Sequence, residues 1–434
     1  MGNLKGIIYL LLLIHAMTPI ANAEPSLIYH HFPACSEKKF EAPISTVNGA
    51  VSYGIKGNVY CDIADKVEQQ KSKGKSEFYA ILQGSDLKRV RFYAFAPSNI
   101  IVKTALCNLS KNGVAIDFVD SGQGNSTHSD TVMALRRCGG NNINASSFYS
   151  GGGIPSFHPK IYIVERNDGK ANLITSSGHP IRGFSYNFEH WVYYDLSVGS
   201  SFFENHMCYL DTIDFMLKKE VGAREGSEFF NQCRVHAGND QHVTPYFLPF
   251  DIEKYRSEIE SDIFEAKEIN ISMFSVGSEW IRNRLLQALK LGVDVKIVVD
   301  DDHFYFYSNG CKNNLQPNCQ YYSSRHQYDR WIAFLAEWGA EVRFLQTNNK
   351  GRGQMLHDKY MIIKGGNPRV YFGSANFTNA AFGKVDRLSG NLENVYSSHL
   401  QKIIESFSVV FGRTWGLGTP LEKLPKDAKS IVFN

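Results

Sequence analysis

The sequence predicts an α/β fold of two similar mixed, mainly parallel sheets that are flanked by helices and packed about a pseudo-twofold axis. Two observations lead to this prediction. Each half of the chain repeats a strand–helix–strand pattern, and each half later repeats a His-x-Lys triplet followed by the same ordered elements. A strand, a helix and a β-branched strand in succession are typical of a βαβ unit. The chain is therefore predicted to be a duplication.

The strand–helix–strand pattern has the same order in both copies. Each third segment begins with Gly-Val, and Gly113 and Gly292 fit the position that caps the C-terminus of the preceding helix. The predicted strand, helix and strand cover residues 89–94, 100–109 and 113–120 in the first copy, and 268–274, 279–291 and 292–300 in the second.

The His-x-Lys triplets are the main candidates for chemistry. They are His158-Pro159-Lys160 and His357-Asp358-Lys359. Residues i and i+2 of a strand point the same way, so each triplet directs an imidazole and an ammonium to one place. Two such pairs facing each other would form a phosphate site with two fixed positive charges. The elements that follow are 161–164, 171–175, Ser176 to Gly178 and Asn187 to Glu189 in the first copy, and 360–363, 369–372, Gly373 to Asn376 and Asn391 to Glu393 in the second.

The N-terminus has the features of a secretory signal peptide. In residues 1–23, Lys5 is the only charge, an apolar run covers 7–14, and Ala21-Asn22-Ala23 is a small-residue cleavage pattern. An uncleaved anchor is the alternative, although the run is short for a membrane span. The mature protein is expected to begin at Glu24 and to lie outside the cytoplasm, secreted or in a periplasm or lumen.

The remaining chain divides into two halves. We predict a first half over residues 24–221, a polar linker over 222–244 and a second half over 245–434. At 434 residues, the chain is long enough for two domains or one large duplicated domain.

Cysteine content favours disulfides. The count is even, which in an exported protein is typical of disulfide bonding, and no Cys-x-x-Cys spacing suggests a metal site. Cys311 and Cys319 bracket a polar loop and form the most evident local pair, whereas the other connectivities stay open. The eight cysteines are Cys35, Cys61, Cys107, Cys138, Cys208, Cys233, Cys311 and Cys319.

The net charge of the chain and its one acidic cluster exclude few classes of function. The formal charge is +3, and it falls to +2 without Lys5, which argues neither for nor against a nucleic-acid partner. The run Asp300-Asp301-Asp302-His303 is interpreted as a strand end followed by a solvated acidic loop rather than a metal site. No metal and no other cofactor is predicted.

The duplicated pattern resembles the phospholipase D superfamily, which includes phospholipases D, phospholipid synthases, bacterial endonucleases and tyrosyl-DNA phosphodiesterases. The resemblance covers most of the mature chain, and the second copy is the better match, with Gly373, Ser374 and Asn376 where the family motif has them. The first copy has Ser176 in place of the Gly and His179 in place of the Asn. The family's acidic residue, five positions after the Lys, is Glu165 in one copy and Lys364 in the other.

The resemblance implies a metal-independent phosphodiesterase with a phosphohistidine intermediate. His158 is expected to be the nucleophile and His357 the general acid, with Lys160 and Lys359 neutralising the non-bridging oxygens. The near-symmetry of the motifs leaves the reverse assignment of the histidines open. Hydrogen bonds to the same oxygens are expected from Ser177, Ser374 and Asn376. Glu189 and Glu393 are candidates to orient the histidines across the pseudo-twofold axis.

Three hypotheses about the function remain open. A phospholipid head group, with peripheral contact to a membrane, is favoured over nucleic acid by export and near-neutral charge. An endonuclease or DNA phosphodiesterase is the alternative, and a catalytically inactive binding relative is the third. Hydrolysis or transfer and the oligomeric state stay open. Basic residues that could contact a nucleic-acid backbone are Lys88, Arg89, Arg91, Lys350 and Arg352.

Overall fold

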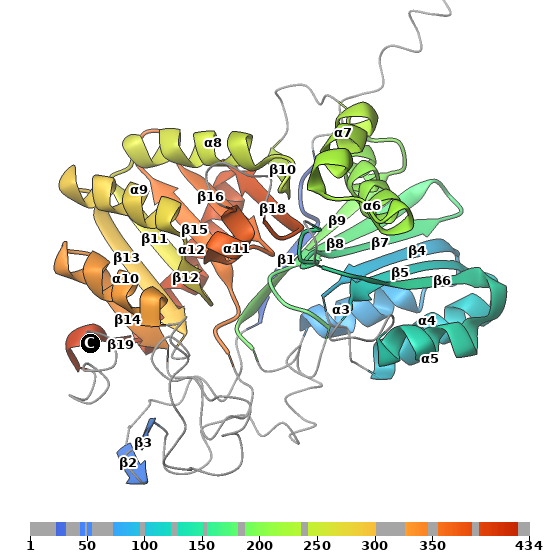
Figure 1. The fold of residues 1–434 in the computed structure, drawn as a ribbon, viewed down its shortest axis with the longest axis horizontal. Helices are drawn as coiled ribbons and strands as arrows, with labels where there is room; N and C mark the ends of the chain where they lie inside the picture. The colour runs from blue at the N-terminus through green and yellow to red at the C-terminus, as the bar shows by residue number, and fades with distance from the viewer. Residues whose placement is uncertain are drawn as a thin grey trace, which may run out of the picture.

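The computed structural model describes a chain with two similar halves (Figure 1). The described residues are 23–31, 44–47, 50–53, 73–95, 100–122, 129–150, 154–180, 187–235, 242–300, 326–345, 355–383 and 390–423. Several predictions concern other parts of the chain. The signal segment up to residue 22, the pair Cys311 and Cys319, and the basic residues Lys350 and Arg352 lie outside the described residues.

The first half contains a seven-stranded sheet in the order β1-β9-β8-β7-β4-β5-β6. Helices α3, α4 and α5 pack on one face of it, below the sheet at the right of Figure 1. The strands are β1 (Leu27–His31), β4 (Leu87–Ala94), β5 (Ala115–Ser121), β6 (Ile143–Phe148), β7 (Lys160–Arg166), β8 (Lys170–Ser176) and β9 (Glu189–Ser197). The helices are α3 (Lys73–Leu82), α4 (Ile100–Lys111) and α5 (Asp130–Gly139), followed by the short 3₁₀ turn η2 (Gly140–Asn142).

The second half repeats this order in an eight-stranded sheet, β10-β18-β16-β15-β11-β13-β14-β19. Only β19, at the edge, has no counterpart in the first sheet. The strands are β10 (Val243–Leu248), β11 (Glu268–Met273), β13 (Asp294–Asp300), β14 (Glu341–Leu345), β15 (Lys359–Lys364), β16 (Arg369–Gly373), β18 (Glu393–Ser398) and β19 (Thr419–Pro420). The outer helices are α8 (Ile252–Phe264), α9 (Glu279–Lys290) and α10 (His326–Glu337).

Smaller elements complete the described part of the chain. They are the hairpin β2 (Ile44–Val47) and β3 (Ala50–Tyr53), the parallel pair β12 (Val276–Gly277) and β17 (Phe377–Thr378), the short helix α11 (Asn379–Phe382) and the 3₁₀ turn η5 (Leu421–Lys423).

Both sheets are mixed, as predicted, but they are not mainly parallel. Parallel pairing is limited to β4–β5–β6 and to β11–β13–β14. From β7 and β15 onwards, the central strands pair antiparallel. The reason is the short connections: β7 and β8 are joined by three residues, Asn167 to Gly169, and so short a loop permits only an antiparallel hairpin. The βαβ pattern therefore describes the first three strands of each copy and not the later ones.

Two long helices, α6 (Ser201–Lys219) and α12 (Gln401–Leu417), follow the last central strand of each half. Their apolar faces enter one shared core with both sheets, which includes Phe202, Phe247, Phe372, Tyr396 and Phe407. The ring of His206 on α6 stacks on Tyr396 and its Nε2 lies 2.9 Å from the Tyr396 hydroxyl. Because this core takes residues from both halves, neither half buries its inner face alone.

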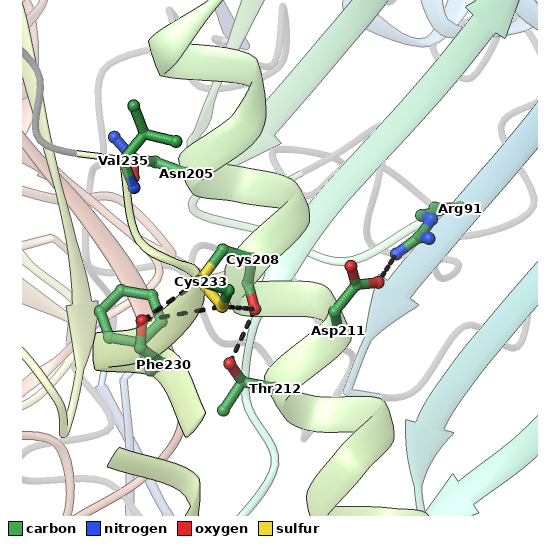
Figure 2. Close-up of a disulfide and its surroundings, with 8 residues drawn as sticks. All are labelled: Arg91, Asn205, Cys208, Asp211, Thr212, Phe230, Cys233 and Val235. Carbon is green, nitrogen blue, oxygen red and sulfur yellow. Dashed lines mark hydrogen bonds and ion pairs between the residues drawn. A yellow bond between two sulfur atoms is a disulfide. The ribbon is translucent and has the colours of Figure 1, made fainter. Parts of the chain in front are cut away.

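The segment predicted as a linker begins with a helix, α7 (Ala223–Cys233), which packs beside α6. A disulfide joins Cys208 on α6 to Cys233 at the end of α7, as Figure 2 shows. A second disulfide, Cys107–Cys138, joins α4 to α5. Amphipathic spacing gives the segment its helix, because Ala223, Gly226 and Phe230 form one buried face. Among the described residues, no helix is long and apolar enough to cross a membrane.

Candidate active site

The two His-x-Lys triplets meet where the halves face each other. Lys160 is the first residue of β7 and Lys359 is the first residue of β15, so each histidine precedes its strand by two residues. The ring of His179 lies 5.4 Å from that of His158 and 6.1 Å from that of His357, measured between centroids. The structure therefore brings together the two histidines that the sequence singled out, and their lysines with them.

Backbone hydrogen bonds between the halves fix the two triplets. The His158 amide donates to Leu392 O at 3.1 Å, and the Leu392 amide donates to Ser156 O at 2.8 Å. In the matching place, the His357 amide donates to Phe188 O and the Phe188 amide donates to Met355 O, both at 2.9 Å. Each triplet is thus paired with the Asn-x-Glu segment of the opposite half, which places each glutamate next to the opposite histidine.

Glu393 holds His158 across this interface. Both carboxylate oxygens of Glu393 lie 2.8 Å from His158 Nδ1. Asn391 Nδ2 and Ser374 Oγ donate to the same carboxylate at 3.1 and 2.6 Å. Burial alone would raise the pKa of Glu393, but His158, Lys160 and Ser374 outweigh it and lower the pKa. Burial lowers the pKa of His158. These directions favour an ionised carboxylate beside a neutral imidazole at neutral pH, and next to a carboxylate the favoured tautomer is the one whose Nδ1 donates to Glu393.

Glu189 occupies the equivalent place beside His357, with looser geometry. Its Oε1 lies 3.6 Å from His357 Nδ1, and that nitrogen has no hydrogen-bond partner within the described part of the chain. Burial raises the pKa of Glu189 to about 7, against the hydrogen bond from Asn187 and the charge of Lys359. The position is closely confined, because a Cβ at Gly178 would lie 2.0 Å from the Glu189 carboxyl carbon. Glu189 is thus poised to hold a proton near neutral pH, unlike Glu393.

The two lysines are buried and point along their own triplets. Lys160 Nζ lies 3.3 Å from both ring nitrogens of His158 and donates to the His158 carbonyl at 3.1 Å. Lys359 Nζ donates to His357 O at 2.8 Å and to Ser177 O at 3.0 Å. Burial lowers the pKa of Lys160 to about 7, and burial together with the charge of Lys160 lowers that of Lys359. An anion in the site would favour the charged form of both.

The two motif serines are engaged with the protein. Ser177 Oγ accepts the His190 amide at 3.0 Å. Ser374 Oγ accepts the Asn394 amide at 2.9 Å while it donates to Glu393. Both serines are fully buried. This geometry favours a positioning role over the phosphate contact predicted from the sequence. Asn376 is only half-buried, and within the described residues its Oδ1 has no hydrogen-bond partner, which leaves this side chain available for substrate.

A second layer of contacts joins the halves behind the site. Asn394 Oδ1 accepts the Lys160 amide at 2.7 Å. In the matching position of the other copy, His190 Nδ1 lies 3.0 Å from Asp358 Oδ1, and both side chains are buried. Sequence reasoning missed these two contacts. The available signal was their position, since each residue directly follows the repeated glutamate of its own copy, Glu393 or Glu189.

Sequence reasoning also missed a pair of phenylalanines. The ring of Phe95 lies 5.4 Å from that of His158, and the ring of Phe274 lies 5.2 Å from that of His357. Lys359 Nζ is 5.6 Å from the Phe274 ring centroid, a cation–π distance. Phe95 directly follows β4 and Phe274 directly follows β11. Their matching places after the first strand of each copy were the signal in the sequence.

Two of the predicted nucleic-acid contacts are occupied elsewhere. Arg91 is buried and pairs with Asp211 at 2.6 Å, as Figure 2 shows, and Arg89 pairs with Asp117 at the same distance. Both arginines belong to β4; Arg91 fastens the sheet to α6, whereas Arg89 links β4 to the neighbouring strand β5. That prediction is corrected for these two residues, whereas Lys88 is exposed.

The acidic run at the end of β13 begins with a structural residue. Asp300 is buried and accepts the Leu356 amide at 2.6 Å, next to the second triplet. Among the described residues, no group of three His, Cys, Asp or Glu side chains is arranged to hold a metal ion. Asp301, Asp302 and His303 lie outside the described residues.

Comparison with known proteins adds a family match for the second half. The family model described as "Cardiolipin synthase, PLD-like domain" matches residues 260–415. No curated protein matches the chain. Solved structures that resemble the fold include the yeast tyrosyl-DNA phosphodiesterase, with a TM-score of 0.48, 13% identity, and coverage of 74% of this chain and 85% of that one.

Two further solved structures illustrate the range of similar proteins. Nuc, a phospholipase D family member from Salmonella typhimurium, has a TM-score of 0.29 and 25% identity, with 41% of this chain and 96% of that chain covered. The polyphosphate kinase from Porphyromonas gingivalis has a TM-score of 0.47 and 10% identity over 81% of this chain. The match spans 48% of the kinase, about half its length.

Proposed function

We propose that this chain, whose residues 260–415 match the phospholipase D-like family model, is a metal-independent phosphodiesterase of the phospholipase D superfamily that acts through a phosphohistidine on His158. The observation that carries the proposal is the hydrogen bond from His158 Nδ1 to the buried Glu393 carboxylate at 2.8 Å. An imidazole that donates from Nδ1 keeps its lone pair on Nε2, which is the nucleophilic form.

In the first step, His158 Nε2 attacks phosphorus. A nitrogen–phosphorus bond forms, the bond to the leaving oxygen breaks, and the electron pair stays on that oxygen. His357 donates a proton to it as the general acid. Burial and the nearby charges of Lys359, Lys160 and His158 lower the pKa of His357 in the free protein. The bound phosphodiester anion reverses this effect, and Glu189 offers a carboxyl group that holds a proton near neutral pH.

In the second step, water attacks the phosphorus of the intermediate and His357 takes its proton. The nitrogen–phosphorus bond breaks, and its electron pair returns to His158 Nε2. Lys160 and Lys359 neutralise the non-bridging oxygens throughout, a task that metal ions perform in many other phosphoryl-transfer enzymes. An alcohol in place of water would give transfer instead of hydrolysis.

We propose phospholipid as the substrate ahead of nucleic acid. Arg89 and Arg91, two of the basic residues that could have met a nucleic-acid backbone, are held in ion pairs. Exposed apolar residues begin α4, five residues after Phe95: Ile100 is 67% and Ile101 is 49% exposed. Exposed apolar side chains of this kind suit an enzyme that meets a lipid surface.

The experiment offers the purified protein four substrates in EDTA: phosphatidylcholine vesicles, single-stranded DNA, double-stranded DNA and bis(para-nitrophenyl) phosphate. We expect hydrolysis of the aryl diester and of phosphatidylcholine. Cleavage of DNA alone would assign the nuclease branch. Loss of all activity in EDTA with recovery on addition of a divalent ion would contradict the metal-independent mechanism.

We also propose that the protein is exported and begins at Glu24 after removal of residues 1–23. The two disulfides Cys107–Cys138 and Cys208–Cys233 support an oxidising compartment. Mass spectrometry of the protein recovered from that compartment should give an N-terminus at Glu24. An intact Met1 would contradict the cleavage.

A further inference from the structure

A third histidine lies beside both proposed catalytic histidines. His179 follows Ser177 by two residues, as Asn376 follows Ser374. The two serines mark equivalent places, because each accepts the amide of the residue after the paired glutamate, His190 or Asn394. His179 therefore occupies in the first half the place that Asn376 has in the second.

The surroundings of His179 direct its ring into the site. Its centroid is 5.4 Å from that of His158 at an interplanar angle of 76°, and 6.1 Å from that of His357 at 53°. Phe95 packs on it at 5.5 Å. The residue is 6% exposed. The ring of His179 therefore lies beside both triplet histidines, where a phosphodiester that contacts the two would be bound.

One ring nitrogen of His179 lacks a hydrogen-bond partner among the described residues. Its Nδ1 is buried, and within the described part of the chain no group forms a hydrogen bond with it. A buried polar atom without a partner is costly unless a ligand completes it. Burial and the charges of Lys160, His158, His357 and Lys359 lower the pKa of His179, which favours a neutral ring with one N–H to donate.

We propose that His179 is a third catalytic imidazole, which donates a hydrogen bond to a non-bridging oxygen of the bound phosphodiester opposite Asn376. The inference rests on the proposed phosphodiesterase function. It adds that the two halves donate hydrogen bonds to the phosphodiester from different groups, an imidazole on the first half and a carboxamide on the second. The group bound between them has tetrahedral oxygens and negative charge.

The test compares His179→Asn, His179→Phe and His179→Ala with the wild type. Calorimetric binding of tungstate, a tetrahedral oxyanion, is measured together with kcat and KM for bis(para-nitrophenyl) phosphate. Loss of a hydrogen bond to a charged group predicts about a 10- to 100-fold weaker tungstate affinity for His179→Phe and His179→Ala. His179→Asn, which copies the second half, should keep affinity within about 5-fold of the wild type, because the carboxamide still donates one hydrogen bond.

The phenylalanine variant separates binding from packing. It keeps an aromatic ring against Phe95 and removes both nitrogens, so wild-type tungstate affinity and wild-type kinetics in His179→Phe would overturn the proposal. Affinity lost in His179→Phe and retained in His179→Asn supports it. If the wild type binds tungstate in this pattern but hydrolyses no diester, the anion contact stands and the proposed phosphodiesterase function fails.

Discussion

At the scale of single residues, the two orienting glutamates differ although their places in the repeat are the same. Glu393 is held by Asn391, Ser374 and His158, and its pKa is lowered. The pKa of Glu189 is raised to about 7. When two carboxyl groups of one site have different pKa values, the group with the higher pKa can hold a proton and the group with the lower pKa stays ionised. The nucleophile is therefore expected on the Glu393 side and the proton donor on the Glu189 side.

We predict different chemical consequences for substitution of the two histidines. His158→Ala should abolish phosphoenzyme formation, because the nucleophilic nitrogen is gone. His357→Asn should still allow attack on an aryl diester, whose leaving group hardly needs a proton, and should accumulate phosphohistidine because breakdown needs the same residue as base. Peptide mapping of the trapped phosphate checks this. Phosphate on His357 in the His158 variant, and none on His158, would reverse the assignment.

The charge of Lys160 predicts a pH dependence. Its pKa in the free protein is lowered to about 7 by burial, so the lysine loses its positive charge as pH rises through that value. Phosphate affinity should fall with it, and kcat/KM, which reports the free enzyme, should decrease above about pH 7.

The control for this dependence is Lys160→Arg, which stays charged throughout the range. Its kcat/KM should be lower at neutral pH, because the planar guanidinium does not reproduce the contacts of the ammonium. The decrease of kcat/KM at high pH should move to a higher pH in this variant. If the decrease stays at the same pH, the titrating group is not Lys160, and Glu189 is the first other group to examine.

At the scale of elements, α6 and α7 depend on a covalent bond. The Cys208–Cys233 disulfide closes a separation of 25 residues. We predict that Cys208→Ala with Cys233→Ala lowers the free energy of unfolding by roughly 2–4 kcal/mol. Faster hydrogen exchange should be confined to residues 223–233, with kcat unchanged. The matched control is Cys107→Ala with Cys138→Ala, which should speed exchange in α4 and α5 and leave α7 protected. Equal effects of both pairs on α7 would contradict a local role.

The sequence predicted the elements that carry local signals. The strand and helix positions of both βαβ units agree with the structure to within about two residues, because alternation and a capping glycine such as Gly113 are local properties. The parallel or antiparallel pairing of the strands was predicted less well, because the three-residue connection from β7 to β8 was not recognised as a hairpin. The triplet side chains were found from repetition. His179 was noticed only as a departure from the motif, because its neighbours Phe95 and His357 come from distant segments.

At the scale of the whole molecule, the halves form one body. The shared core takes apolar side chains from both sheets and from α6 and α12. One described disulfide lies within the first half, and the other joins α6 of the first half to α7 of the linker segment, so neither described disulfide joins the two halves. Their association rests on apolar burial and on the hydrogen bonds that link each triplet to the opposite copy.

We predict that the halves stay together after the chain is cut. A protease site inserted between Arg234 and His242 and then cleaved should give two fragments that elute as one species with unchanged kcat. The reason is that separation would expose the shared apolar core. Unfolding in denaturant and isolation of each fragment should abolish activity, because His158 then lacks Glu393. Fragments that separate without denaturant would contradict the prediction, as would an active single half.

The crossed pairing of histidines with glutamates has a consequence for how such a duplicated sequence changes over time. Duplication usually provides a spare copy in which harmful substitutions are tolerated. Here Glu393 contacts His158 and Glu189 lies beside His357, so under the proposed mechanism a substitution in either copy would disturb the histidine of the other. Selection must then act on both copies as one unit at these positions. At positions outside these crossed pairs the two copies differ, as they do at His179 and Asn376, and there one repeated pattern provides two different hydrogen-bond donors.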